Sequence, residues 1–147
     1  MAEATRPEQT RDESDIAEIR QSVSQLCAKY GEDYWLDMDR TNGYPSDFVA
    51  ELTRAGFLGV LIPEEYGGAG MGILEEAIVS EEMSWGDPGF GTAQYSNGLT
   101  AAPIITGGTE EQKHKYLGML AKEPLIAAYC VTEPGAGSDV SGIKTTA

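Results

Sequence analysis

Residues 88–105 read PGFGTAQYSNGLTAAPII, a stretch of apolar and small side chains without one charged residue. A helix that is apolar nearly all round is usually buried at the centre of a helical domain. We therefore expect this stretch to form the most buried helix of an all-α unit, with the remaining helices packed around it.

The sequence over residues 15–56, upstream of this stretch, predicts two helices. Asp15 and Glu18 resemble a capping box, and apolar residues recur after them at helical spacing. This helix is expected to continue or to restart after Gly31. Pro45 suits the first turn of the second helix, and Gly56 suits the residue that ends it.

Further helices are expected on both sides of the central stretch. One covers about residues 73–83, after a glycine-rich loop. Another begins at the capping box of Thr109 and Gln112 and runs to Lys122. Residues 125–131 then have strand character, so the helical unit gives way there to something different.

The net charge, the cysteine spacing and the hydropathy of the sequence each exclude some classes of protein. Ten Lys and Arg face 24 Asp and Glu, a net charge of −14 that repels nucleic acid. Cys27 and Cys130 lie far apart without a CxxC motif, so we expect buried free thiols and no metal site. The N-terminus is acidic and lacks a signal-peptide core, and no apolar run is long enough to span a membrane. These features predict a cytoplasmic protein.

Several weaker patterns have plain structural explanations. The glycines around Gly68 and Gly70 lack the third glycine and the second βα unit of a dinucleotide site. His114, the single histidine, lies between two lysines and is expected at the surface. Adjacent acidic pairs such as Glu75 and Glu76 diverge on a helix, which favours solvated faces over a paired acid and base.

The segment 129–142, YCVTEPGAGSDVSG, is the strongest chemical motif. Pro134, Gly135 and Gly137 free backbone N–H groups from regular pairing, and Thr132 and Ser138 add hydroxyls. Such uncharged donors suit a phosphate or the electron-rich edge of a heterocycle. A tight surface turn is the alternative explanation.

This segment resembles the first signature of the acyl-CoA dehydrogenase family, and its form is closest to the medium-chain type. The resemblance extends upstream through residues 62–68 (IPEEYGG), 80–82 (SEE), 103–105 (PII) and 116–117 (YL). Family members are FAD-dependent enzymes of fatty acid β-oxidation that desaturate acyl-CoA thioesters between the α and β carbons. Their fold has an N-terminal helical domain, a middle β domain and a C-terminal helical domain.

The resemblance divides the chain into three parts: a disordered tail (1–14), the N-terminal helical domain (15–122), and the first strand and flavin loop of a truncated β domain (123–147). It assigns FAD-binding positions to Tyr129, Val131, Thr132, Gly137 and Ser138. It assigns substrate-binding positions to Ser138, on the CoA side, and to Thr92, Tyr95 and Leu99, along the acyl pocket.

No catalytic residue is assigned, because the family's catalytic glutamate belongs to the C-terminal domain. The chain is therefore expected to be an N-terminal piece of the enzyme, inactive alone. The resemblance implies an electron-transfer flavoprotein as acceptor and a homodimeric or homotetrameric parent. It leaves the acyl-chain length open. An acyl-CoA oxidase of the same superfamily and a non-catalytic binding or assembly module are the alternatives.

Overall fold

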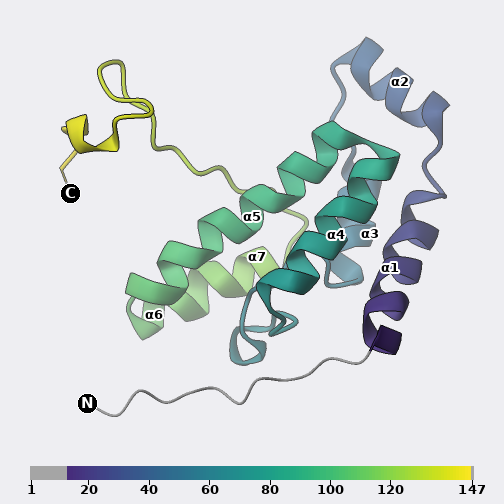
Figure 1. Ribbon diagram of the computed structural model, residues 1–147, viewed down its shortest axis with the longest axis horizontal. Coiled ribbons are helices and arrows are strands. Elements are labelled where there is room, and N and C mark those ends of the chain that lie inside the picture. Colours follow the sequence, from purple (N-terminus) through teal and green to yellow (C-terminus); the bar gives the residue numbers. More distant parts are fainter. Residues whose placement is uncertain (1–12, 147) are drawn as a thin grey trace.

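The structure is a computed structural model that describes residues 13–146, which form helices and no strand (Figure 1). The α-helices are α1 (Glu13–Cys27), α2 (Glu32–Thr41), α3 (Ser46–Arg54), α4 (Ile73–Gly86), α5 (Pro88–Gly107), α6 (Glu110–Gln112) and α7 (Gly118–Lys122). Two 3₁₀ turns, η1 (Glu64–Tyr66) and η3 (Val140–Gly142), and one π-helical stretch, η2 (Lys113–Leu117), complete them. The predicted all-α class is confirmed.

The start of α1 differs from the prediction. The helix begins at Glu13, so Asp15 lies inside the first turn and does not cap it. The proposed capping box of Asp15 and Glu18 is therefore wrong. Of the predicted tail, Glu13 and Ser14 are helical, and residues 1–12 lie outside the described residues.

Helices α4 and α5 form a tight antiparallel hairpin joined by Asp87 alone. The Asp87 carboxylate accepts a 2.6 Å hydrogen bond from the Phe90 N–H and so caps α5. The two helices approach closely, because a Cβ added at Gly91 would lie 2.2 Å from Ser84 Oγ. Helix α1 packs along α4, and Arg20 forms an ion pair of 2.5 Å with Glu82 across that contact.

The core consists of two clusters of buried side chains, one toward each end of α5. The first cluster comprises Val23, Leu26, Phe48, Val49, Leu52, Leu58, Val60, Val79, Met83 and Phe90. The second cluster comprises Ile62, Tyr66, Ala101, Leu117, Leu120 and Ala121. Phe90 and Ala101 belong to different clusters, so α5 contributes to both, as does the connector after α3 through Val60 and Ile62.

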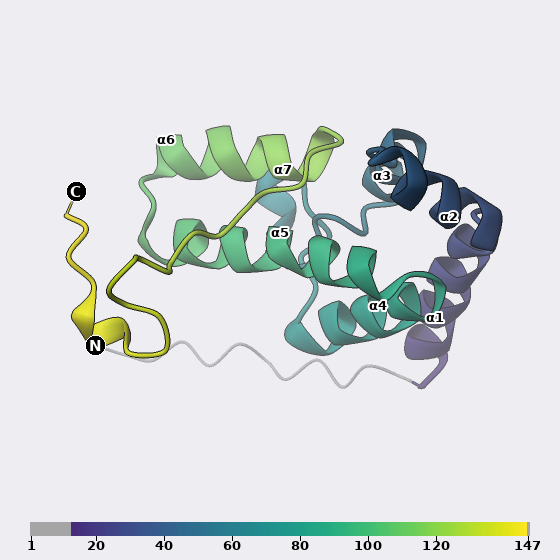
Figure 2. The ribbon, with the colours of Figure 1, turned by 90° about the horizontal axis from the view of Figure 1, so that it is seen from above.

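The run α6–η2–α7 lies alongside α5 (Figure 2). Its predicted capping box is confirmed, since the Gln112 N–H donates to Thr109 Oγ1 at 3.2 Å and the Thr109 N–H to Gln112 Oε1 at 2.9 Å. The predicted end of α3 is confirmed as well. Gly56 has a φ of +82°, a left-handed conformation that terminates the helix at little cost for glycine.

Residues 125–131 are not a strand, which corrects the prediction. A strand requires a hydrogen-bonded neighbour, and no other segment of residues 13–146 pairs with these residues as a ladder. The segment leaves α7, crosses α5 and ends in a separate loop (Figure 1). Helix α7 ends at Lys122, and the division of the chain into domains at that point remains a prediction.

Candidate functional site

Helix α5 has one buried face and one open face, although its sequence is apolar on both. Its buried residues are Phe90, Gly91, Gln94, Asn97, Gly98 and Ala101. Thr92, Tyr95 and Leu99 lie on the other side, and Tyr95 and Leu99 are 42% and 38% exposed. We call these three residues the open face of α5. The predicted all-round burial is therefore wrong for this side of the helix, where other described elements do not cover it.

The open face contains the three predicted acyl-pocket residues. Their spacing of three and four positions places them on one side of the helix. The Thr92 hydroxyl is bonded to its own helix, donating to the Pro88 carbonyl at 3.1 Å. An apolar surface with a polar rim, such as the Tyr95 phenol provides, suits a long aliphatic ligand.

The buried face of α5 carries a network of polar side chains that was not predicted from the sequence. Gln94 is 1% exposed, and its Nε2 donates to Phe57 O at 3.1 Å and to Glu76 Oε1 at 3.2 Å. The Ser80 hydroxyl donates to Gln94 Oε1 at 2.8 Å. The network thus joins α4, α5 and the connector after α3.

Glu75 and Glu76 are both buried, so the prediction of a solvated acidic pair is wrong here. Glu75 Oε2 accepts a 2.7 Å bond from the Gly72 N–H. Burial raises the pKa of Glu76 to about 7, although the hydrogen bond from Gln94 opposes the shift. Gln94 is one of two amide side chains in a helix without charged residues, and this was the available signal of a buried polar partner.

The predicted cofactor-binding residues lie in the loop beyond α7. Tyr129 is 54% exposed, Thr132, Gly137 and Ser138 are exposed, and Val131 is half-buried. An antiparallel bridge between Glu133 and Ala136 closes the turn at its centre.

Glu133 holds this loop in shape. Its carboxylate accepts bonds from the Lys144 N–H at 2.9 Å, the Thr145 N–H at 2.8 Å and the Thr145 hydroxyl. The hydroxyl bond, followed by the two backbone bonds, lowers the pKa of Glu133. The loop is therefore organised by its own residues.

The loop offers hydrogen-bond donors without positive charge. Within the described chain, the backbone N–H groups of Val131, Thr132, Gly137 and Ser138 donate to no other residue, and neither do the Thr132 and Ser138 hydroxyls. Such groups fit a phosphate or the edge of an electron-rich ring.

Asn97 is the residue of α5 that hydrogen-bonds, among the described residues, to the segment leading into the loop. No hydrogen bond in residues 13–146 links the open face of α5 directly to residues 129–138. Asn97, on the buried side of α5, instead bonds to Leu125 and Ala127, just before the loop.

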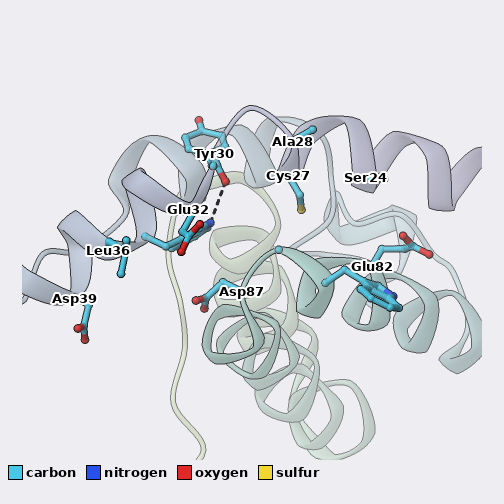
Figure 3. Close-up of a pocket in the computed structure, with 13 residues that line it drawn as sticks. Ser24, Cys27, Ala28, Tyr30, Glu32, Leu36, Asp39, Glu82 and Asp87 are labelled. Atoms are coloured by element: carbon cyan, nitrogen blue, oxygen red, sulfur yellow. Dashed lines mark hydrogen bonds between the residues drawn. The ribbon is translucent and has the colours of Figure 1, made fainter.

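A hollow between α1, α2 and the α4–α5 junction lies away from both predicted regions. It has a volume of about 670 Å³, and the Cys27 sulfur points into it (Figure 3). Burial, and then the charge of Glu82, raises the pKa of this thiol. None of the predicted site residues lines the hollow. Both cysteines are free, but Cys130 is exposed, so its predicted burial is wrong.

His114 is exposed as predicted, and its ring packs edge-on against Tyr66 with 4.9 Å between ring centroids.

No group of three His, Cys, Asp or Glu side chains among the described residues could hold a metal ion. Within the same residues, no helix is long and apolar enough to cross a membrane.

Comparison with known proteins identifies the family to which the chain belongs. The family described as "Acyl-CoA dehydrogenase, N-terminal domain" matches residues 13–124. The chain is 40% identical over 142 residues to the "Probable medium-chain specific acyl-CoA dehydrogenase 2, mitochondrial" of Caenorhabditis briggsae, covering 93% of this chain and 35% of the relative. The chain therefore spans about a third of the length of this curated relative.

Two solved structures are similar in fold and sequence. An acyl-CoA dehydrogenase from Bacillus anthracis, complexed with FAD, superposes with a TM-score of 0.75 at 33% identity, over 94% of this chain and 24% of that one. The prolyl acyl carrier protein oxidase AnaB superposes with a TM-score of 0.79 at 31% identity, over 92% of this chain and 36% of that one.

Proposed function

The chain belongs to the acyl-CoA dehydrogenase family, and from this we propose that it forms the N-terminal helical part of an FAD-dependent enzyme that desaturates fatty acyl-CoA thioesters between the α and β carbons. The observation that carries the proposal is the open face of α5. Thr92, Tyr95 and Leu99 leave a helix face uncovered, and the resemblance assigns these positions to the acyl chain.

In this proposal the open face binds the aliphatic tail of the thioester. Burial of each methylene of the tail against Tyr95 and Leu99 contributes about 0.8 kcal/mol of transfer free energy. The bulk of the Tyr95 side chain limits how far the tail extends along the helix.

The loop beyond α7 would hold FAD, the cofactor bound in the similar Bacillus anthracis structure. When bound, FAD supplies the acceptor for the hydride from the β carbon. Tyr129, Val131 and Thr132 would bind its ring through backbone groups and the Thr132 hydroxyl. Gly137 and Ser138 would bind its pyrophosphate, and Ser138 would also contact the CoA side of the substrate. Free N–H and hydroxyl donors in this loop fit those roles.

We assign no catalytic base among the described residues. The reaction needs a carboxylate within hydrogen-bond reach of the α-proton. Glu133 and Asp139 adjoin the proposed flavin residues in sequence, but Glu133 accepts bonds from Lys144 and Thr145, and Asp139 accepts from Ser141. This chain's residues therefore bind and orient cofactor and substrate in the proposal.

An oxidase is the second candidate, since the similar protein AnaB is an oxidase acting on an acyl carrier protein. The two activities differ in whether oxygen reaches the reduced cofactor. For a dehydrogenase, we propose an electron-transfer flavoprotein as acceptor and a homodimeric or homotetrameric assembly. The predicted cytoplasmic location stays a prediction, and the worm relative is described as mitochondrial.

The test is a steady-state assay of the native polypeptide that carries this sequence. With a medium-chain acyl-CoA, we expect turnover with an artificial electron acceptor and little hydrogen peroxide in air. Peroxide formation equal to turnover would support the oxidase instead. Absence of turnover with every acyl thioester under both conditions would refute both candidates.

A further inference from the structure

We propose that Asn97 is a positioning residue that fixes the proposed flavin loop to α5. Its side chain is 1% exposed and points away from the open face of the helix. Nδ2 donates to the Leu125 carbonyl at 3.0 Å, and Oδ1 accepts from the Ala127 N–H at 2.7 Å. One side-chain amide therefore binds two backbone groups that flank Ile126.

This pair of bonds takes the place of a neighbouring strand. A residue on an adjacent parallel strand would offer the same pair, its N–H to the carbonyl before Ile126 and its C=O to the N–H after it. Residues 125–131 have no ladder partner within the described chain, and Asn97 satisfies two of their backbone groups in its absence. This explains why the segment is held at that point without being a strand.

The side chains around the bonds anchor the same point. Ile126 packs against the first cluster and Ala127 against the second. Leu125 and Tyr129, on either side, are 38% and 54% exposed. Residues 126–127 are therefore the last positions before the loop that are held to the helical core.

The attachment of residues 126–127 to the helical core limits where the loop begins. Tyr129 follows Ala127 by two residues, so it lies within about 7 Å of it even in a fully extended chain. Asn97 thus sets the origin of residues 129–132 relative to α5. The inference rests on the proposed function for what these residues then bind, and on the two hydrogen bonds alone for their placement.

Asparagine is the side chain that this geometry needs. Aspartate at this position would lose the donor and place a negative charge against the Leu125 carbonyl oxygen at neutral pH. A protonated aspartic acid would regain a donor. Leucine has a similar size but neither a donor nor an acceptor.

Amide hydrogen exchange of the 147-residue chain, followed by NMR, tests the inference without flavin or thioester, so its outcome is independent of the proposed function. We expect a protected Ala127 amide in the wild type. Asn97→Leu should remove that protection about tenfold or more at every pH. Asn97→Asp should remove it at about pH 8 and recover part of it at about pH 5.5, because burial favours the protonated acid.

Asn42→Asp is the matched control, since Asn42 is the other asparagine of the chain and is exposed at the end of α2. It should leave Ala127 exchange unchanged. If either Asn97 variant fails to fold, the wild type decides by itself, because a bonded Asn97 side-chain amide exchanges slowly. An unprotected Ala127 amide in the wild type, or unchanged protection in a folded Asn97→Leu chain, would overturn the inference.

Discussion

Gln94 and Asn97 lie on the buried face of α5, and each finds its hydrogen-bond partners outside its own helix. Gln94 binds groups from α4 and from Phe57, whereas Asn97 binds the segment after α7. A buried amide without partners would cost about 1–3 kcal/mol, so each residue favours one arrangement of distant segments. The sequence revealed two polar residues in an apolar helix, but spacing along one helix carries no information about partners elsewhere in the chain.

Glu76 gives a pH-dependent prediction at this scale. Its pKa is raised from 4.5 to about 7 in the folded protein by burial. Between these two pH values the unfolded carboxyl is ionised while the folded one keeps its proton, so this group lowers stability as pH rises from about 4.5 to about 7. Above that pH its destabilising effect is constant, at roughly 1–3 kcal/mol.

Glu76→Gln cannot ionise and retains an oxygen that accepts from Gln94. We therefore expect its free energy of unfolding, relative to wild type, to increase between pH 5 and pH 8 by about that amount. Urea titrations at both pH values measure it. Glu18→Gln, on the exposed surface of α1, is the control and should follow the wild type. Parallel behaviour of Glu76→Gln and wild type would contradict the assignment.

At the scale of elements, local signals predicted what local chemistry decides. Gly56 ended α3, and Thr109 with Gln112 opened α6, because these motifs act within a few residues. The predicted strand over residues 125–131 failed, since a strand depends on a partner that local sequence does not reveal. Burial of α5 was overestimated on its open face for a related reason, because hydrophobicity shows that a face can be buried but not what covers it.

The two faces of α5 give a prediction from adjacent alanines. Ala101 is fully buried in the second cluster, and Ala102 is exposed. Ala101→Asp places a carboxylate among Ile62 and Leu117, so we expect a loss of about 3 kcal/mol or more in the free energy of unfolding. Ala102→Asp makes the same change in helix propensity. It should change the free energy of unfolding by about 0.5 kcal/mol or less, because the side chain is exposed. Equal effects in thermal or urea unfolding would contradict the face assignment.

At the scale of the whole molecule, α5 links the two core clusters, and the loop beyond α7 is tied to its flank. The helices supply a rigid support, the open face of α5 supplies an apolar surface, and the loop supplies uncharged donors. The family resemblance in the sequence assigned both proposed functional regions by residue. It did not reveal Asn97, which connects them, because that contact joins positions about thirty residues apart.

The central claim is that this chain belongs to an enzyme that transfers electrons from an acyl-CoA thioester to bound FAD. The most direct measurement is the visible absorbance of the native polypeptide carrying this sequence, captured from its host and titrated anaerobically with a medium-chain acyl-CoA. We predict a flavin spectrum that bleaches on addition of the thioester, with free CoA as the control that leaves it unchanged. A protein without flavin, or a flavin spectrum that no acyl-CoA bleaches, would contradict the account.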